Sequence, residues 1–332
     1  MISDQSTKTY DVVCVGSSVV DIPLQPVDKS VFDTVSYPVD DISMHVGGDA
    51  LNESIVLSRL GANVALVSAV GNDAAGQFIV KTAKDAGVDT TGINVKNGMT
   101  TSLNVGLVRP DGERTFVTNR NGSLWTTTES DICADPFLHG SILAFGSIYN
   151  NPLLKGPWLE SLFQKAHLAG MTVCADMVPS RVGEGLDEIR SALAFVDYFF
   201  PNADEAMTLT GTRTYIEAAQ ALIDTGITTV VMKLGSRGCL VHTRESSHEI
   251  PAFIRDDLSV IDTTGAGDNF ASGFICALLD GEKTSEECAL FANAVAAVSV
   301  AGLGATSAVQ SRTQIEKFIS TRTKVKENNE NW

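Results

Sequence analysis

The sequence has few basic residues for its length and no long apolar run. Lysine and arginine number 24 against 40 aspartates and glutamates in 332 residues, so the formal net charge is −16. Nucleic acids and anionic membranes are bound by basic surfaces, so this balance argues against both as partners. No apolar stretch approaches the roughly 20 residues that span a bilayer, and the N-terminus lacks the pattern of a signal peptide. We therefore expect a cytoplasmic protein.

Paired cysteines and two common nucleotide-binding signatures are also missing. The six cysteines are scattered without a spacing such as C-x-x-C, and several lie in apolar runs, which indicates buried free thiols in a reducing compartment. Gly16 ends a strand pattern but has no partner glycines at the offsets of a dinucleotide fingerprint, and no G-x-x-x-x-G-K-[ST] loop occurs. These absences exclude a Rossmann oxidoreductase and a P-loop kinase.

Strand and helix patterns alternate steadily over the second half of the chain. Apolar strand patterns at 142–145, 171–175 and 229–234 are separated by helical patterns. Such alternation predicts an α/β fold with a central, mainly parallel sheet covered by helices on both faces. Hydrophobic residues make up 44% of the chain, enough for a large core. We expect one domain over residues 10–322 and a disordered tail over 323–332, which is charged and rich in amides.

Two stretches depart from this alternation. Residues 17–46 contain three prolines, short strand patterns and no helical period. Residues 99–120 contain the clearest hairpin, with a turn at Pro110-Asp111-Gly112. We expect these two β pieces to pair and form a small separate sheet.

The stretch from Asp262 to Asp268 reads Asp-Thr-Thr-Gly-Ala-Gly-Asp and leads into a helical pattern. Two glycines flank one alanine, so nothing bulky covers the backbone amides. Free amides at a helix start attract anions, and the helix dipole adds to the attraction. A carboxylate belongs beside such a site if it accepts a proton from a hydroxyl that attacks a bound phosphate. The whole string therefore favours a phosphoryl-transfer site over a plain strand-to-helix turn.

The chain resembles the PfkB-type carbohydrate kinases of the ribokinase-like superfamily over nearly its full length. The two family motifs are matched by Gly47-Gly48 with Asn52 and by Asp262 to Asp268. Two lesser landmarks follow the family order: Asn202-Ala203-Asp204-Glu205, and Lys233-Leu234-Gly235 with Gly238. The resemblance implies a ribokinase-like fold and an ATP-dependent kinase. Its acceptor would be a hydroxyl, expected to be primary, of a small sugar or polyol.

The resemblance assigns roles on the side of the phosphoryl donor. Asp268 would be the general base, and the amides of Gly265, Ala266 and Gly267 would form an anion hole for the γ-phosphoryl group. The other nucleotide-binding positions would be Asn202, Thr263, Lys233, Gly235, Gly238 and Asn293, of which the last four resemble the adenine and ribose wall. Each of those four residues alone is more typical of a structural position.

Two cation sites are also implied by the resemblance. Asn202 and Glu205 would help to hold Mg²⁺ and phosphates, often through water. From the residues alone, this pair is equally a cap for the helix that follows. Asp262 and Thr264, with residues 304–305, match a K⁺ site of some members.

On the acceptor side, four residues match positions that bind sugar hydroxyls: Asp21, Gly47, Gly48 and Asn52. Short carboxylate and amide side chains suit vicinal diols. Asp49 departs from ribokinase itself, which has a lysine at this position, so strict ribose specificity is not implied. Arg120 resembles an arginine that several members place near the substrate, although it also fits an exposed strand end. Further candidates are Asp176 and Arg181, which capping and surface exposure explain equally well.

Two rival functions stay open. A nucleoside kinase of the same fold needs an apolar or aromatic cover for its base, which Phe32, Tyr37 and Trp125 could supply. A catalytically silent sugar-binding regulator is a different class, but a pure binder has no need of the general base at Asp268. The two β pieces would form a lid over the sugar. Because an exposed sheet needs cover, we also expect a homodimer through this lid.

Overall fold

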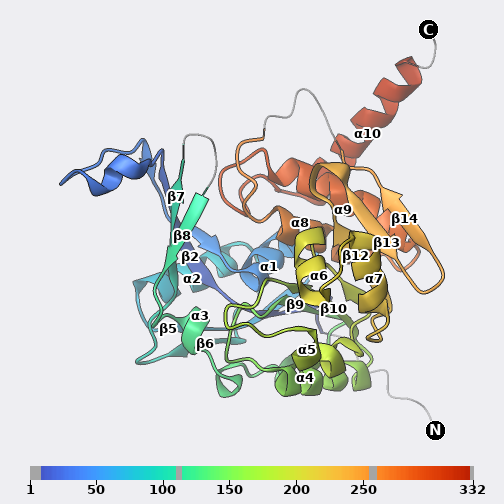
Figure 1. Ribbon diagram of the computed structural model, residues 1–332, viewed down its shortest axis with the longest axis horizontal. Helices are drawn as coiled ribbons and strands as arrows, with labels where there is room; N and C mark the ends of the chain where they lie inside the picture. The colour runs from blue at the N-terminus through green and yellow to red at the C-terminus, as the bar shows by residue number, and fades with distance from the viewer. Residues whose placement is uncertain (1–8, 110–113, 254–259, 330–332) are drawn as a thin grey trace.

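A computed structural model describes residues 9–109, 114–253 and 260–329 (Figure 1). In these residues, a nine-stranded sheet has the order β14-β13-β12-β11-β10-β9-β1-β5-β6. Its strands are β1 (Val12–Gly16), β5 (Val64–Gly71), β6 (Ile93–Lys96), β9 (Ile142–Ile148), β10 (Thr172–Met177), β11 (Tyr198–Phe199), β12 (Thr229–Lys233), β13 (Cys239–His242) and β14 (Ser247–Ile250). The strands from β6 to β12 are parallel, and β13 and β14 add an antiparallel edge. The predicted α/β fold is confirmed.

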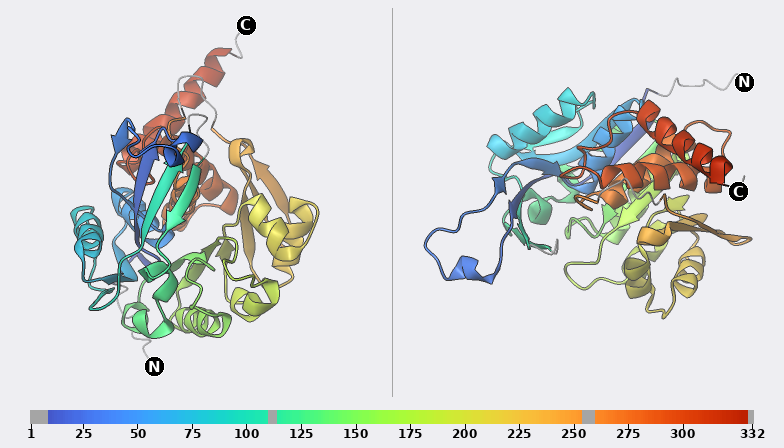
Figure 2. Two further views of the ribbon diagram at one scale, coloured as in Figure 1. Left: turned by 60° about the vertical axis from the view of Figure 1, so that its left-hand side comes forward. Right: turned by 90° about the horizontal axis from the view of Figure 1, so that it is seen from above.

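Helices cover both faces of this sheet, as Figures 1 and 2 show. They are α1 (Asp49–Arg59), α2 (Ala74–Asp85), α3 (Ser123–Thr126), α4 (Gly156–Leu168), α5 (Leu186–Leu193), α6 (Ala203–Thr210), α7 (Tyr215–Ile223), α8 (Ala266–Leu278), α9 (Ser285–Ser299) and α10 (Arg312–Asn329). Successive residues of β1 face opposite cores: Val12 and Cys14 pack with α1, α8 and α9, and Val13 and Val15 pack with α4, α5 and α7. A strand buried on both faces explains the unbroken apolar run in its sequence.

The two β pieces pair as a separate small sheet, as predicted. It consists of β2 (Val19–Gln25), β3 (Asp41–Ile42), β4 (His45–Gly47), β7 (Leu103–Val108) and β8 (Arg114–Thr118). The central strands β2 and β7 are parallel, with Asp21 opposite Asn104. A short 3-10 helix at Lys29–Phe32 projects from this sheet, away from the rest of the molecule (Figure 2). The expected turn at Pro110-Asp111-Gly112 lies outside the described residues.

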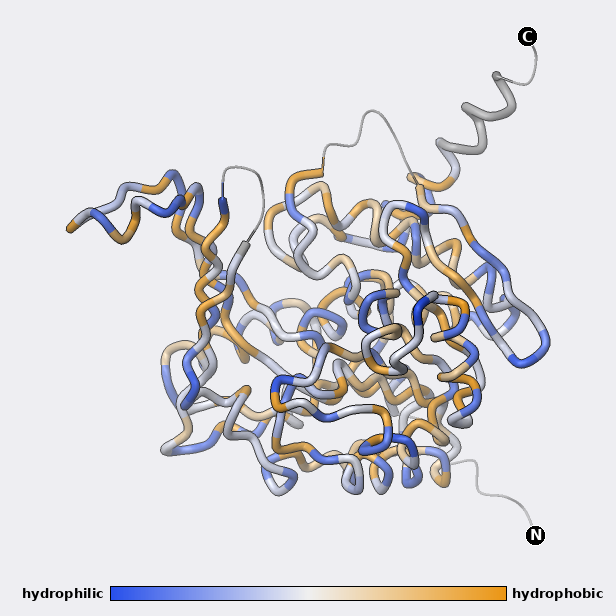
Figure 3. The backbone as a smooth tube through the Cα atoms, viewed as in Figure 1, coloured by the Kyte–Doolittle hydropathy of each residue, from blue (hydrophilic) through white to orange (hydrophobic). Residues whose placement is uncertain are grey.

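Exposed apolar side chains mark the small sheet and its projecting arm. Figure 3 shows hydrophobic stretches along these strands as well as in the middle of the molecule. The exposed residues of this kind are Phe32, Val35, Ile42, Met44, Phe116 and Val117. Val117 is 56% exposed, so β8 presents an apolar position to solvent in the single chain.

The end of the chain is formed by helix α10, which runs through Asn329. The disordered tail expected over 323–332 stays a prediction. Ile315 in its first turn is fully buried and anchors the helix on the core. The Lys and Glu residues that follow are good helix formers, which is consistent with the continuation. Residues 330–332 lie outside the described part. No helix in the described residues is long and apolar enough to cross a membrane.

Close packing of α8 on α9 positions the start of α8, and Gly273 permits it. A Cβ built on Gly273 would lie 2.9 Å from both Ala292 Cα and Val295 Cγ2. Real Cβ atoms do not approach neighbours this closely, so any larger residue forces the two helices apart.

We predict that Gly273→Val lowers the free energy of unfolding by about 1–3 kcal/mol through overpacking. Urea unfolding measures the loss. Ala74→Val, at the exposed start of α2, is the control, because it adds the same branched side chain without a clash. Equal stability of the two variants would show that the helix contact is looser than the structure indicates.

Candidate active site

The start of helix α8 is a turn built by glycine. Gly265 has φ 70°, in the left-handed region, and a Cβ on it would lie 2.4 Å from the Ala305 Cβ. The side chain of Asn269 donates to the carbonyls of Gly265 and Ala305 at 2.8 and 2.7 Å, which fixes the turn against the 305 loop. No side chain caps this helix. The sequence therefore folds here into an open helix N-terminus.

Three backbone amides at this helix start have no acceptor in the described residues: those of Gly265, Gly267 and Asp268. The amide of Ala266 donates to the Thr263 carbonyl at 3.2 Å, and that of Asn269 donates to Gly265. Of the three amides assigned to the anion hole, that of Ala266 is thus already used in a turn, and those of Gly265 and Gly267 are available. Free amides at a helix start bind anions.

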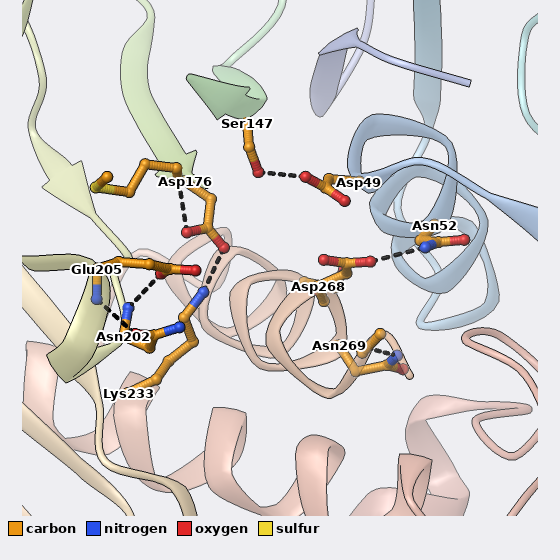
Figure 4. A network of polar contacts seen from close by, with 12 residues as sticks. Asp49, Asn52, Ser147, Asp176, Asn202, Glu205, Lys233, Asp268 and Asn269 are labelled. Carbon is orange, nitrogen blue, oxygen red and sulfur yellow. Dashed lines mark hydrogen bonds and ion pairs between the residues drawn. The ribbon is translucent and has the colours of Figure 1, made fainter. Parts of the chain in front are cut away.

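The carboxylate of Asp268 joins its own motif to the glycine-pair motif (Figure 4). Its Oδ2 accepts a hydrogen bond from Asn52 Nδ2 at 2.7 Å, across 216 residues of chain. Burial, together with the negative charge of Asp49, raises the pKa of Asp268 to about 8, although the Asn52 bond works in the opposite direction. A carboxyl with a pKa near neutrality can both accept and release a proton, as a general base requires.

Asp21 lies against the backbone of the glycine pair. Its Oδ1 accepts from Asn104 Nδ2 at 2.9 Å, and a Cβ on Gly47 would lie 2.0 Å from its Oδ2. Gly48 has φ 91°, and a Cβ there would lie 2.6 Å from the Ser17 carbonyl oxygen. Both glycines are thus required by close contacts.

Two cavities adjoin each other along Val260 and Thr263, which line both, whereas Gly47, Gly48 and Asn52 line neither. One, of about 700 Å³, contains all six residues predicted to bind the nucleotide: Asn202, Lys233, Gly235, Gly238, Thr263 and Asn293. Asp49, Asp176, Glu205 and Asp268 line its polar end, and Phe253, Ala296, Ala297 and Val300 line its apolar end. We call it the nucleotide cavity. The other, of about 780 Å³, lies between the small sheet and residues 260–264 and contains Asp21. We call it the acceptor cavity.

The Asn202–Glu205 pair is a helix cap in this structure. Asn202 Oδ1 accepts from the amide of Glu205 at 2.8 Å, and Glu205 Oε2 accepts from the amide of Asn202 at 2.8 Å. These two side-chain oxygens each accept a hydrogen bond, and both residues also line the nucleotide cavity. Burial raises the pKa of Glu205 to about 7. Capping and cation binding are thus compatible roles.

The donor set fits a metal held mainly by phosphate and water. The described residues contain no group of three or more His, Cys, Asp or Glu that could hold a metal ion by themselves. Mg²⁺ keeps several waters and usually takes only one or two carboxylates with substrate phosphates. Glu205 and Asp176, at the polar end of the nucleotide cavity, match that sparse requirement.

Asp262 joins two loops. Its Oδ1 accepts from the Thr264 amide and hydroxyl at 2.8 and 2.6 Å, and its Oδ2 accepts from the Gly304 amide at 2.8 Å. The Asp262 carboxylate therefore holds the 262–264 turn against residue 304. The K⁺ site expected at Asp262 and Thr264 stays a prediction.

Sequence reasoning missed two side chains and left Asp176 unresolved. Ser147, in β9, donates to Asp49, and Asn104, in β7, donates to Asp21. Asp176 is buried in β10 and binds Lys233. Ser147 and Asp176 lie near the carboxyl ends of neighbouring parallel strands, where ligands bind in α/β sheets, so strand position was the available signal. Arg120 is exposed and lines neither cavity.

The mainly parallel sheet, the open start of α8 and the carboxylate that lines the nucleotide cavity agree with the ribokinase-like kinase that the sequence motifs predict. Residues 9–312 match the model of the pfkB family of carbohydrate kinases. The chain belongs to this family and is a carbohydrate kinase.

Relatives support this assignment. Ribokinase of Haemophilus influenzae is 30% identical over 284 residues, which cover 82% of this chain and 87% of the relative. Aminoimidazole riboside kinase of Salmonella typhimurium is 30% identical over 289 residues, with coverage of 83% and 88%. Among solved structures, Arabidopsis thaliana ribokinase in complex with ribose and ATP superimposes with a TM-score of 0.80 at 23% identity, over 93% of this chain and 98% of that chain. That likeness shows the fold.

The raised pKa values of Asp268 and Glu205 predict how stability varies with pH. Each folded-state pKa exceeds the unfolded value of about 4. The folded protein therefore binds more protons than the unfolded chain from about pH 4 to about pH 8, and stability falls as pH rises through this window. Urea unfolding without nucleotide should show this fall between about pH 5.5 and about pH 8.5. Asp268→Asn should flatten it. Stability that rises with pH in this window would contradict the assignment.

Proposed function

We propose that this protein transfers the γ-phosphoryl group of ATP to a hydroxyl, expected to be primary, of a small sugar or sugar-like polyol. The observation that carries the proposal is the position of Asp268. Its carboxylate lies beside the free amides of the α8 start and bonds to Asn52 of the glycine-pair motif at 2.7 Å. One group thus lines the cavity for the phosphoryl donor and contacts the motif expected to bind the acceptor hydroxyl. Residues 10–322 would act as one kinase domain.

In the proposed reaction, the acceptor hydroxyl loses its proton to Asp268 as its oxygen attacks the γ-phosphorus. Asn52 orients the carboxylate, and Asp21 with Asn104 holds the other hydroxyls of the acceptor. The backbone from Gly265 to Gly267 would form the anion hole, with the free Gly267 amide as a donor to the phosphoryl oxygens. The rest of the nucleotide would lie toward the apolar end of its cavity, between Gly235, Gly238 and Asn293.

Mg²⁺ would neutralise part of the phosphate charge when bound, and Glu205 and Asn202 are the residues proposed to orient its water shell. Their side chains line the polar end of the nucleotide cavity. K⁺ is proposed only as an activator near Asp262 and Thr264. Because Asp262 joins the 262–264 turn to Gly304, a cation there would act on the shape of the loop that precedes the anion hole.

The second candidate is a nucleoside kinase. It is suggested by the similarity to aminoimidazole riboside kinase. Of the three aromatic residues considered for a base, Phe32 is 85% exposed on the projecting arm. Trp125 is covered by Arg181, whose guanidinium carbon lies 5.5 Å from the ring centroid. None of the three, Tyr37 included, lines the acceptor cavity, but Phe116 does. An aromatic side chain is thus available there, and the choice of acceptor needs a direct test.

A panel of acceptors decides between these functions. ADP release from MgATP is measured with ribose, fructose, related polyols and a set of nucleosides. We expect turnover with at least one free sugar or polyol. Turnover with nucleosides alone would favour the second candidate. Clear sugar binding by calorimetry without turnover of any acceptor would favour a regulator that has lost catalysis.

We predict that Asp268→Asn folds normally and loses phosphoryl transfer by ~10²–10⁴-fold, the usual range for general-base help. The loss follows because an amide cannot accept the hydroxyl proton. Steady-state kinetics with the best acceptor measures it. Asp187→Asn, an exposed carboxylate on α5, is the matched control and should keep full activity. Near-native turnover of Asp268→Asn would remove Asp268 from the chemistry.

We also propose a cytoplasmic homodimer through the small sheet, which would then act as a lid over the acceptor. All six cysteines are unpaired and five are buried, which suits a reducing compartment. The exposed apolar residues of the sheet, among them Ile42 and Val117, need cover in water. Since Phe116 lines the acceptor cavity, the neighbouring Val117 points to the opposite face of the sheet. That opposite face is the proposed interface.

We predict that the wild-type protein elutes as a dimer in size-exclusion chromatography with light scattering. Val117→Asp should shift it toward the monomer, because a charge would be buried in the interface. Leu168→Asp, at the exposed end of α4, adds the same charge elsewhere and should leave the dimer intact. A wild-type monomer at working concentration, or a dimer that tolerates Val117→Asp, would contradict this interface.

A further inference from the structure

Lys233 lies at the phosphoryl end of the nucleotide cavity and not at its apolar end. It is the last residue of β12, and its side chain extends to Asp176, where Nζ bonds Oδ2 at 2.5 Å (Figure 4). A Cβ built on Gly267 would lie 3.2 Å from Nζ. The glycine thus keeps open a direct approach of the ammonium to the start of α8. The free amide of Gly267 lies on the same stretch of backbone.

The charges around Lys233 make it the natural partner of a phosphate. It is the one basic side chain among the described residues that line the nucleotide cavity. Four carboxylates line the same cavity: Asp49, Asp176, Glu205 and Asp268. Burial raises the pKa of each of these carboxyls, which reflects how poorly the cavity accommodates negative charge. A triphosphate brings several more negative charges, so its binding requires cations at this end of the cavity.

The backbone of Lys233 is fixed while its ammonium remains free to change partners. Its amide donates to the Pro201 carbonyl at 2.9 Å, and the residue forms a bridge with Asn202, so the root of the side chain is held. Asp176 is held as well, because its Oδ1 accepts from the Met177 amide at 2.7 Å. The four-carbon stem of a lysine can turn its ammonium between acceptors without moving the backbone.

We propose that Lys233 is a catalytic residue whose ammonium binds the transferred phosphoryl group, and that Asp176 is a positioning residue that holds the ammonium over Gly267. The inference rests on the proposed function. The bond between the acceptor oxygen and the γ-phosphorus forms, and the bond from the γ-phosphorus to the bridging oxygen of ADP breaks. The acceptor proton passes to Asp268. Lys233 donates hydrogen bonds to the phosphoryl oxygens and keeps its own protons.

This assignment differs measurably from a place in the adenine and ribose wall. ADP has the adenine and the ribose but lacks the γ-phosphoryl group. A wall residue therefore affects the binding of ADP and of a non-hydrolysable ATP analogue equally. A residue that binds the γ-phosphoryl group affects the binding of the ATP analogue more than the binding of ADP. The ratio of the two dissociation constants thus reports the role of Lys233 without any turnover.

The experiment compares wild type, Lys233→Met and Lys233→Arg by calorimetry with Mg-ADP and Mg-AMP-PNP. We expect Lys233→Met to weaken the binding of AMP-PNP by about 10-fold more than the binding of ADP, because a charge-assisted hydrogen bond is lost only with the analogue. Its kcat should fall by about 10²–10³-fold, as for loss of a transition-state donor. Lys233→Arg should give a ratio of dissociation constants between those of wild type and Lys233→Met, since it keeps the charge. Lys81→Met, on the surface of α2, is the matched control.

Lys233→Met leaves Asp176 buried without its partner, so folding needs a safeguard. The double variant Asp176→Asn/Lys233→Met removes both charges and should fold, while it shows the same altered ratio. Equal weakening of the two nucleotides, or near-native kcat in the double variant, would overturn the proposal. A wild-type protein that binds both nucleotides but phosphorylates no acceptor would instead contradict the proposed function, and the ratio would still decide the role of Lys233.

Discussion

The hydrogen bond from Asn52 to Asp268 is the contact on which the rest of the site depends. It joins the first turn of α1 to the first turn of α8, and both helices begin at glycines that larger residues could not replace. The bond therefore depends on the close packing of the glycine turns. These turns depend on the two hydrophobic cores that hold the helices on the sheet. Stability and chemistry meet here, because a shift of either helix start separates the amide from the carboxylate.

The site concentrates negative charge that the fold alone does not neutralise. Burial raises the pKa values of Asp49, Asp176 and Asp268, and the charge of Asp49 adds to the rise at the other two, while Lys233 offsets only one charge. Such an arrangement is unfavourable for an empty protein and favourable for one that binds cations with its substrate. The protein accepts this cost at one sheet edge, where the carboxyl ends of parallel strands place these residues together.

Much of this could be predicted from the sequence. Alternating patterns predicted the mainly parallel sheet, and the glycine motifs singled out Asp268 and Asn52, which the structure brings into hydrogen-bond contact. The parallel pairing of β2 with β7 was not readable, since strand patterns carry no direction. The position of the Lys233 ammonium could not be predicted from the sequence either, because a long side chain can reach several ångströms from its backbone. Ser147 and Asn104 gave no motif, as single polar residues in strands rarely do.

The two cavities share a wall. Val260 and Thr263 line both the nucleotide cavity and the acceptor cavity. A ligand in one cavity that fixes the position of this wall also changes the shape of the other cavity. Thermodynamic linkage then requires reciprocity: the factor by which nucleotide alters affinity for the acceptor equals the factor by which acceptor alters affinity for the nucleotide. The coupling between the two ligands is therefore a property of this segment as much as of the residues that contact them.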